Sequence, residues 1–368
     1  MTTSLSRRAF RRPTALLFAA TLGAATLSAC SSSGDNADGG SDAGADKETI
    51  QVVASTSIWA DVAQAVVNTA QTDVNIDVHA IVSGNSVDPH HFEPTAADIA
   101  RANEADVIIA GGGGYDAWLY QAVKNQDQII HALPLTAHDH GDHAHDEHDH
   151  GEEHEHDHED GHDERAHDHA HEHGHDHDHA HEGDTVTMDE AKKIAAEHPE
   201  QVTNIDGNEH VWYDAAAIEK VATEVAELVN ETNPEAKATA DPLVERVEGL
   251  KARIEKLPQR NYAQTEPIAD YIFKYTDSTD ATPEGYRKAT VAEGEPTAAD
   301  LARFLEDIKQ DKIDLLIFNP QTETDMTKRI RAAAEDKNIP VVEIGETPPE
   351  GTNFLDYYEE VVNALEAV

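Results

Sequence analysis

The sequence predicts an α/β protein made of two Rossmann-like lobes with mainly parallel sheets, joined by a long rigid helix. The first observation is that short apolar runs alternate with amphipathic segments in both halves of the 368-residue chain. Parallel strands linked by crossover helices produce this alternation. The second observation is an apolar stripe at helical spacing between the two halves, consisting of Leu243, Val247, Leu250, Ile254 and Leu257. A helix of that length indicates a rigid connection between the lobes.

The first lobe is expected over residues 48–234. Its apolar runs predict strands at residues 50–55, 74–82, 107–110, 128–133 and 202–205. Its amphipathic segments predict helices at residues 58–70, 96–102, 117–124, 188–198 and 215–230, the second of them capped by Thr95. The four glycines at 111–114 lack the spacing of a phosphate-binding loop and indicate a close backbone turn at the end of a strand.

The linker is expected over residues 235–257 and the second lobe over 258–368. Asp241 is the predicted cap of the linker helix, with Pro242 in its first turn, and Pro258 stops it. Strands of the second lobe are predicted at residues 261–265, 286–291, 313–318 and 341–344. Helices are predicted at residues 267–275, 297–310, 325–337 and 353–365.

The N-terminus has the pattern of an export signal. Four arginines within residues 7–12 precede an apolar stretch at 14–27, which is too short to span a membrane as a helix. Residues 6–10 are similar to a twin-arginine signal, and general secretion stays open as the alternative. Residues 1–29 are therefore expected to be a signal peptide.

Cys30 is the predicted lipidation site. The sequence Leu27-Ser28-Ala29-Cys30 resembles the lipobox of bacterial lipoproteins, in which the cysteine is acylated, so the resemblance implies an extracytoplasmic protein anchored to the cell membrane. Residues 30–47, rich in Ser, Gly, Asp and Ala, suit a flexible tether. Because Cys30 is the only cysteine, an intrachain disulfide and a cysteine-ligated zinc site are excluded.

A histidine-rich segment at residues 138–184 interrupts the first lobe. It holds 18 of the 24 histidines among Asp, Glu, Gly and Ala, and without larger apolar residues it is expected to be disordered. Imidazole binds zinc, copper and nickel, so the segment is predicted to capture metal, zinc above all; a merely solvated charge run is the alternative. Its matches to H-E-x-x-H follow from composition and lack the helix that a metalloprotease needs. The histidines are His138, His140, His143, His145, His148, His150, His154, His156, His158, His162, His167, His169, His171, His173, His175, His177, His179 and His181.

Four candidate metal ligands lie in loops after predicted strands: His90 and His210 in the first half, Glu266 and Glu346 in the second. Open α/β sheets bind ligands beyond the carboxyl ends of their strands, so we expect a site between the lobes. Two imidazoles and two carboxylates are able to close a four-point shell around a borderline divalent ion.

The motifs around these residues resemble the zinc/manganese (cluster A-I) family of metal-binding lipoproteins of ABC importers. His90 lies in Asp-Pro-His, His210 opens His-Val-Trp-Tyr-Asp, and Glu266 and Glu346 match the third and fourth ligand positions. The resemblance covers about residues 48–368 and implies that these four residues hold the metal. Glutamate at the third position resembles members assigned to manganese as well as zinc. His91 and Glu343 are alternative ligands, and Asn319 and Gln321 are expected to hydrogen-bond the ligands.

The expected function is therefore that of a monomeric receptor, not an enzyme, which captures Zn²⁺ or else Mn²⁺ and passes it to an ABC-type permease. The net charge of −46 argues against nucleic acid as a partner. Two alternatives belong to other classes. One is an extracytoplasmic zinc buffer or adhesin. The other is a zinc metallo-hydrolase, which would need an open coordination position and a general base.

Overall fold

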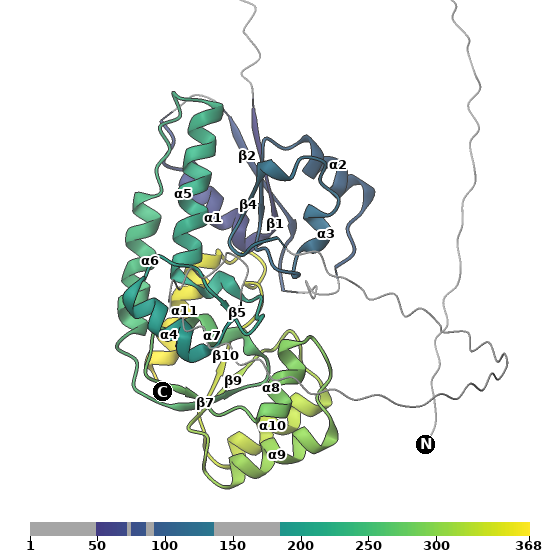
Figure 1. Cartoon of the computed structure of the whole chain (residues 1–368), viewed down its shortest axis with the longest axis vertical. Helices are drawn as coiled ribbons and strands as arrows, with labels where there is room; N and C mark the ends of the chain where they lie inside the picture. The colour runs from purple at the N-terminus through teal and green to yellow at the C-terminus, as the bar shows by residue number, and fades with distance from the viewer. Residues whose placement is uncertain (1–48, 72–74, 86–91, 136–184) are drawn as a thin grey trace, which may run out of the picture. The chain divides into compact units, whose positions relative to one another are not determined.

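A computed structural model of the chain describes residues 49–71, 75–85, 92–135 and 185–368 (Figure 1). The described residues form two four-stranded sheets in which every strand pairing is parallel. The strand order in the first is β2 (Ile76–Val82), β1 (Ile50–Thr56), β3 (Val107–Ala110) and β4 (Ile129–His131). The order in the second is β10 (Val341–Glu343), β9 (Leu315–Phe318), β7 (Asn261–Gln264) and β8 (Thr279–Asp280). This confirms the predicted α/β class with two lobes. The predicted signal peptide, tether and histidine-rich segment lie outside the described residues.

The first sheet is buried on both of its faces. Val52 and Ala54 of β1 belong to one apolar cluster with α1 and α5, whereas Val53 between them belongs to another with α2 and α3. Figure 1 shows these two pairs of helices on opposite sides of the strands. Continuous apolar runs such as 107–110 are the consequence of that double burial. The elements of this lobe are β1 Ile50–Thr56, α1 Ser57–Val67, β2 Ile76–Val82, α2 Ala96–Glu104, β3 Val107–Ala110, α3 Ala117–Tyr120, β4 Ile129–His131 and α5 Ala215–Thr232.

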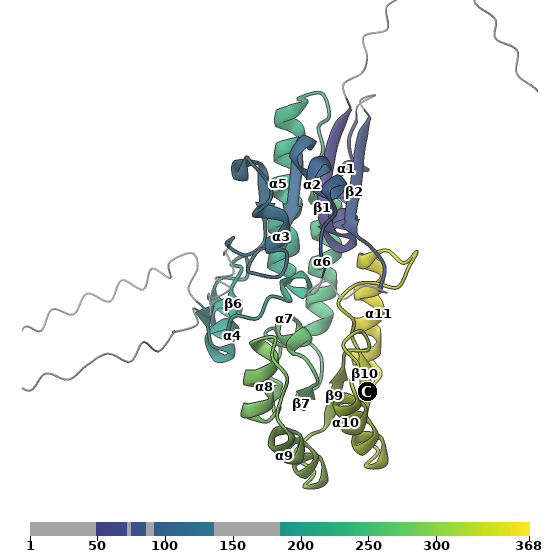
Figure 2. The same ribbon diagram turned by 90° about the vertical axis from the view of Figure 1, so that its right-hand side faces the viewer.

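The second sheet repeats this arrangement. Leu315 and Ile317 of β9 pack in one cluster with α11, and Leu316 packs in another with α8, α9 and α10. Figure 2 shows α8 and α11 on opposite sides of these strands. The elements are β7 Asn261–Gln264, α7 Asp270–Phe273, β8 Thr279–Asp280, α8 Glu284–Val291, α9 Ala298–Lys309, β9 Leu315–Phe318, α10 Asp325–Asp336, β10 Val341–Glu343 and α11 Phe354–Glu366.

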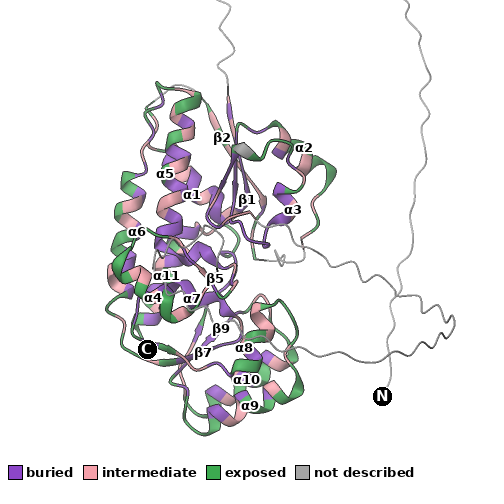
Figure 3. Cartoon of the chain, viewed as in Figure 1, coloured by how far each residue is buried: buried purple, intermediate pink, exposed green. Residues whose placement is uncertain are grey.

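Helix α6 (Asp241–Ile254) connects the two halves, and its buried face carries four of the five predicted stripe residues (Figure 3). The fifth, Leu257, lies beyond the end of the helix and is only partly buried. Leu243, Val247, Leu250 and Ile254 all enter the cluster that α5 and α11 share. Charged pairs fasten its outer face to α11, with Arg246 2.6 Å from Asp356 and Arg253 2.6 Å from Glu366. No helix of the described residues is both long enough and apolar enough to cross a bilayer.

The segment after the histidine-rich region forms a small unit of its own. It comprises β5 (Thr185–Val186), α4 (Met188–Glu197) and β6 (Asn204–Ile205), and the two strands pair with each other rather than joining either large sheet. The strand predicted at 202–205 therefore exists in part, but it does not extend the first sheet.

Two local predictions were wrong, and a third was right only in part. Residues 286–291 are helical in α8, where Pro283 precedes the first turn and Glu284 lies in it, and the edge strand of the sheet is β8 instead. The helix predicted at 267–275 is a 3₁₀ turn (Pro267–Ala269) followed by the short α7. Asp241 does not cap α6: Ala240 is the N-cap, and Asp241 is the first helical residue.

The glycine turn after β3 is the close backbone approach that the sequence predicts. The amide of Leu133 donates to the Gly111 carbonyl at 2.9 Å, and the amide of Gly113 donates to the Pro134 carbonyl at 3.1 Å. Gly112 has φ 90°, and a Cβ there would lie 2.0 Å from the Leu133 carbonyl oxygen. Only glycine fits this position.

We expect Gly112→Ala to lower the free energy of unfolding by about 1–3 kcal/mol or more, because the strained φ adds to the clash. Urea unfolding would measure the change. Gly249→Ala is the matched control, since Gly249 is an exposed residue of α6 with no heavy atom within 4 Å of the added Cβ. That change should be neutral or stabilise by about 0.5–1 kcal/mol. Equal midpoints for Gly112→Ala and the parent would contradict this account of the turn.

Candidate metal centre

The candidate ligands of the second lobe lie where neighbouring strands end. Glu266 follows β7, Asn319 follows β9 and Glu346 follows β10. These strands are adjacent in the order β10-β9-β7, so the parallel sheet brings the three side chains to one edge. His210 approaches from the short 3₁₀ helix Val211–Tyr213, of which it is the N-cap residue.

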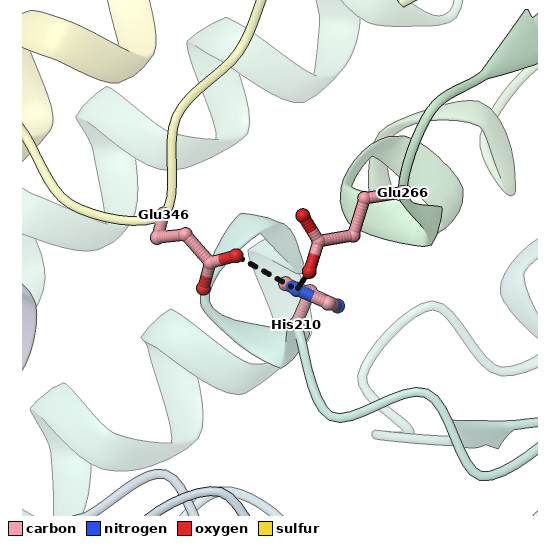
Figure 4. Close-up of side chains that lie close together, drawn as sticks. All are labelled: His210, Glu266 and Glu346. Atoms are coloured by element: carbon pink, nitrogen blue, oxygen red, sulfur yellow. Dashed lines mark ion pairs between the residues drawn. The ribbon is translucent and has the colours of Figure 1, made fainter. Parts of the chain in front are cut away.

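His210, Glu266 and Glu346 converge as Figure 4 shows. The Nε2 atom of His210 lies 3.6 Å from Glu266 Oε1 and 3.5 Å from Glu346 Oε1. One ligand atom from each residue lies within 4.8 Å of the others, close enough for a single ion to reach all three. The His210 and Glu346 side chains are 5% and 0% exposed, and Glu266 is 13% exposed.

Polar neighbours orient both carboxylates. The side-chain amide of Asn319 donates to Glu266 Oε2 at 2.5 Å and to Glu346 Oε1 at 2.9 Å. This is the role that the sequence predicts for Asn319. Thr322 Oγ1 also donates to Glu266 Oε2 at 2.5 Å, and the hydroxyl of Tyr115 donates to Glu346 Oε2 at 3.2 Å.

Gln321 acts on the backbone that carries Glu346 rather than on a ligand itself. Its Oε1 accepts from the Thr347 amide at 2.9 Å, and its Nε2 donates to the Thr347 hydroxyl at 3.0 Å. The Gln321 amide in turn donates to Asn319 Oδ1 at 2.9 Å. The loops after β9 and β10 are therefore tied together beside the site.

Glu343 does not join the cluster. It is half exposed and lies 2.6 Å from Arg331 of α10. Glu343 is in β10 and extends to Arg331 of α10, whereas Glu346 lies in the loop beyond the strand. His90, His91, Cys30 and the eighteen clustered histidines lie outside the described residues.

Three residues that hydrogen-bond the candidate ligands have no sequence motif that would identify them. Tyr115 and Thr322 reach the carboxylates from separate loops, and Asn208 accepts a hydrogen bond from His210. Only the placement of Asn208 two residues before a candidate ligand was a possible signal.

The two carboxylates change the protonation of His210. Burial alone would lower the pKa of this imidazole, but Glu346 and Glu266 outweigh burial and raise that pKa to about 9. When no metal is bound, the His210 ring is therefore protonated and positively charged at neutral pH, between the carboxylates of Glu266 and Glu346. A divalent ion would replace that proton and use the freed Nε2 lone pair.

Comparison with known proteins identifies the family. The family model described as "Zinc-uptake complex component A periplasmic" matches residues 52–368. The chain belongs to this family. That membership confirms the resemblance that the ligand motifs indicate, and the zinc-uptake component A family covers both lobes.

Curated relatives of this family member are substrate-binding lipoproteins of ABC transporters. The iron ABC transporter substrate-binding lipoprotein MtsA of Streptococcus pyogenes serotype M1 is 33% identical over 114 residues, which are 30% of this chain and 33% of that protein. The manganese lipoprotein PsaA of Streptococcus pneumoniae serotype 4 is 34% identical over 82 residues, 21% of this chain and 25% of that protein. The matches thus span a third or less of the relatives' length, and neither name denotes an enzyme.

Solved structures agree on the fold. A crystal structure of ZnuA has a TM-score of 0.52 at 15% identity and covers 87% of this chain and 98% of that one. The laminin-binding protein Lmb of Streptococcus agalactiae, described as having adhesin and metal-transporting activity, has a TM-score of 0.55 at 15% identity, with 87% and 99% covered. At this identity the likeness shows the two-lobed fold of the family.

Because the pKa of His210 is about 9, we expect ion binding at neutral pH to release about one proton from this residue. The release should fall as the pH rises through about 9, where the ring is already neutral. Calorimetric titration in two buffers with different ionisation enthalpies measures the number of protons directly. Identical apparent binding enthalpies in both buffers at neutral pH would contradict the proposed protonation of His210.

Proposed function

We propose that the chain is an extracytoplasmic receptor that captures a divalent transition metal, Zn²⁺ in the first place, and delivers it to an ABC-type permease. The observation that carries this proposal is the convergence of His210, Glu266 and Glu346 in a buried position. Two carboxylates beside a neutral imidazole carry a charge of −2, which a divalent cation balances. Buried charges without such a partner are costly.

His90 is the proposed fourth ligand, on the strength of its Asp-Pro-His motif and the family. A shell of two imidazoles and two carboxylates is a donor set that zinc accepts readily. Manganese is the second candidate, because carboxylate oxygens suit harder ions and because PsaA is named a manganese-binding relative. Competition between the two ions for the purified protein measures which one the site prefers, and by how much.

Membrane attachment and partners follow from the same proposal. Cys30 would carry the lipid anchor, residues 30–47 would be the tether, and the receptor would act as a monomer beside its permease. The clustered histidines would bind zinc loosely and raise its concentration near the site. A metal buffer or adhesin without a permease is the other possibility, favoured by the dual description of Lmb. Binding to the permease distinguishes the two.

We propose no catalytic reaction. A catalytic zinc site keeps a water-bearing position and a separately placed general base. Here both nearby carboxylates approach His210 Nε2 within 3.6 Å, which makes them ligands in the proposal and leaves neither for the role of a base. A zinc metallo-hydrolase is therefore the weakest of the alternatives.

Replacing a ligand should weaken zinc binding at the site between the lobes. We expect His210→Ala, His90→Ala or Glu346→Gln each to lower zinc affinity at least about tenfold, measured by chelator competition in a chain that lacks residues 139–182. Glu343→Gln is the matched control, because Glu343 is three residues from Glu346 but pairs with Arg331 at 2.6 Å. Unchanged affinity in the three ligand variants would remove the proposed site.

The histidine-rich segment should contribute only weak sites. The composition of this segment predicts that its imidazoles must lose conformational freedom to form a shell, whereas ligands held by folded loops lose less. Deleting residues 139–182 should therefore remove several weak zinc equivalents, which mild acidification also displaces because free histidine has a pKa near ~6.5. One tight equivalent should persist in a calorimetric titration. If the deletion removes the tight equivalent instead, the assignment of Glu266 and Glu346 is wrong.

A further inference from the structure

Asn208 holds the imidazole of His210 through its side-chain oxygen. Asn208 Oδ1 lies 2.7 Å from His210 Nδ1 and also accepts from the His210 amide at 3.0 Å. On its other side, Asn208 Nδ2 donates to the Pro267 carbonyl at 2.5 Å and to Asp270 Oδ2 at 2.8 Å. Asn208 is only 2% exposed, so these partners account for its side chain without recourse to bulk solvent.

These contacts fix which nitrogen of His210 carries a proton. A backbone carbonyl only accepts hydrogen bonds, so the Asn208 amide nitrogen must face Pro267 and its oxygen must face His210. His210 Nδ1 is then the donor. When the ring is neutral, its lone pair is on Nε2, the atom that faces Glu266 and Glu346.

Asp270 anchors this arrangement from the second lobe. It is fully buried, and its Oδ1 accepts from Gln264 Nε2 at 2.6 Å. Arg287 donates to both of its oxygens, at 3.1 Å and 2.9 Å. Arg287 also lies 2.9 Å from Asp280, so the guanidinium is held by a second carboxylate. The Asn208 amide is thus bonded to a charged group with little freedom to move.

Other contacts tie the same stretch of chain to α7. The hydroxyl of Tyr271 donates to the Asn208 carbonyl at 2.6 Å and accepts from the Ile205 amide at 3.3 Å. Asp214 forms a buried pair with Lys274 at 2.7 Å. Arg287 of α8 also donates to Asp206, at 3.1 Å. Although His210 precedes the linker helix in sequence, the residues around it are therefore bonded to α7 and α8, in the lobe that also carries Glu266 and Glu346.

We propose that Asn208 and Asp270 are positioning residues that make His210 part of a three-ligand half-site held by the second lobe, an inference that rests on the proposed metal-binding function. The pair presents Nε2 to the ion in the correct tautomer and keeps His210 in register with Glu266 and Glu346. Its effect should be larger for zinc than for manganese, because zinc depends more on an imidazole nitrogen and manganese more on carboxylate oxygens.

We test this proposal by measuring the zinc and manganese affinities of Asn208→Ala in the chain that lacks residues 139–182. Loss of such a supporting hydrogen bond should raise the zinc dissociation constant by about 10–100-fold and that of manganese by less. Asn230→Ala is the matched control, because Asn230 of α5 makes a similar pair of bonds to the backbone of Ala238, which precedes α6, at 2.8 Å and 2.7 Å. The control should lower the unfolding temperature without changing the ratio of the two affinities.

If Asn208→Ala does not fold, Asp270→Asn serves in its place, since it preserves the volume and removes the charge that anchors the Asn208 amide. The same selective loss of zinc affinity is expected, to a smaller degree. A ratio of affinities equal to that of the parent and of Asn230→Ala would overturn the positioning role while leaving the receptor function intact. A parent protein that binds neither ion would overturn both.

Discussion

The centre of this structure is a pair of glutamates that face one buried imidazole. Glu266 and Glu346 come from loops 80 residues apart in sequence, yet both place an oxygen within 3.6 Å of His210 Nε2. Two negative charges in a poorly hydrated position repel each other unless a cation lies between them. In the absence of metal the proton on His210 supplies part of that charge, and a divalent ion supplies all of it. On the proposed function, metal binding at this site would exchange that proton for a divalent ion.

The rest of the fold keeps those charges at fixed positions. Parallel strands deliver Glu266, Asn319 and Glu346 to one edge of a sheet, and Asn319 bonds to both carboxylates. The sheet is buried on both faces, so its strand ends have little freedom. Helices α6 and α11 brace the connection between the lobes through buried apolar residues and two short ion pairs on their outer faces.

The sequence contained enough to predict the architecture, and three of its four candidate ligands, His210, Glu266 and Glu346, do lie together. Apolar runs covered on both faces and a stripe of helical spacing are strong periodic signals, and they located β1, β3, β9 and α6 correctly. The motifs around Glu346 and Asn319 placed both residues near the site.

The sequence alone did not separate Glu343 from Glu346, because that distinction depends on Arg331 of a neighbouring helix. Nor did it reveal Asn208 or Asp270, whose contact joins residues 62 positions apart. The predicted edge strand at residues 286–291 is helix α8, and the actual edge strand β8 was missed. A two-residue strand such as β8 has no periodicity that a sequence pattern could reveal.

The most direct measurement is anomalous diffraction at the zinc absorption edge from crystals of the chain without residues 136–184, grown with one equivalent of zinc. We expect one strong peak, about 2.0–2.2 Å from His210 Nε2 and from one oxygen each of Glu266 and Glu346. Asn208 Oδ1 should still face Nδ1 of the same ring. A single peak elsewhere in the molecule, with His210 and the two glutamates arranged as they are without metal, would contradict it.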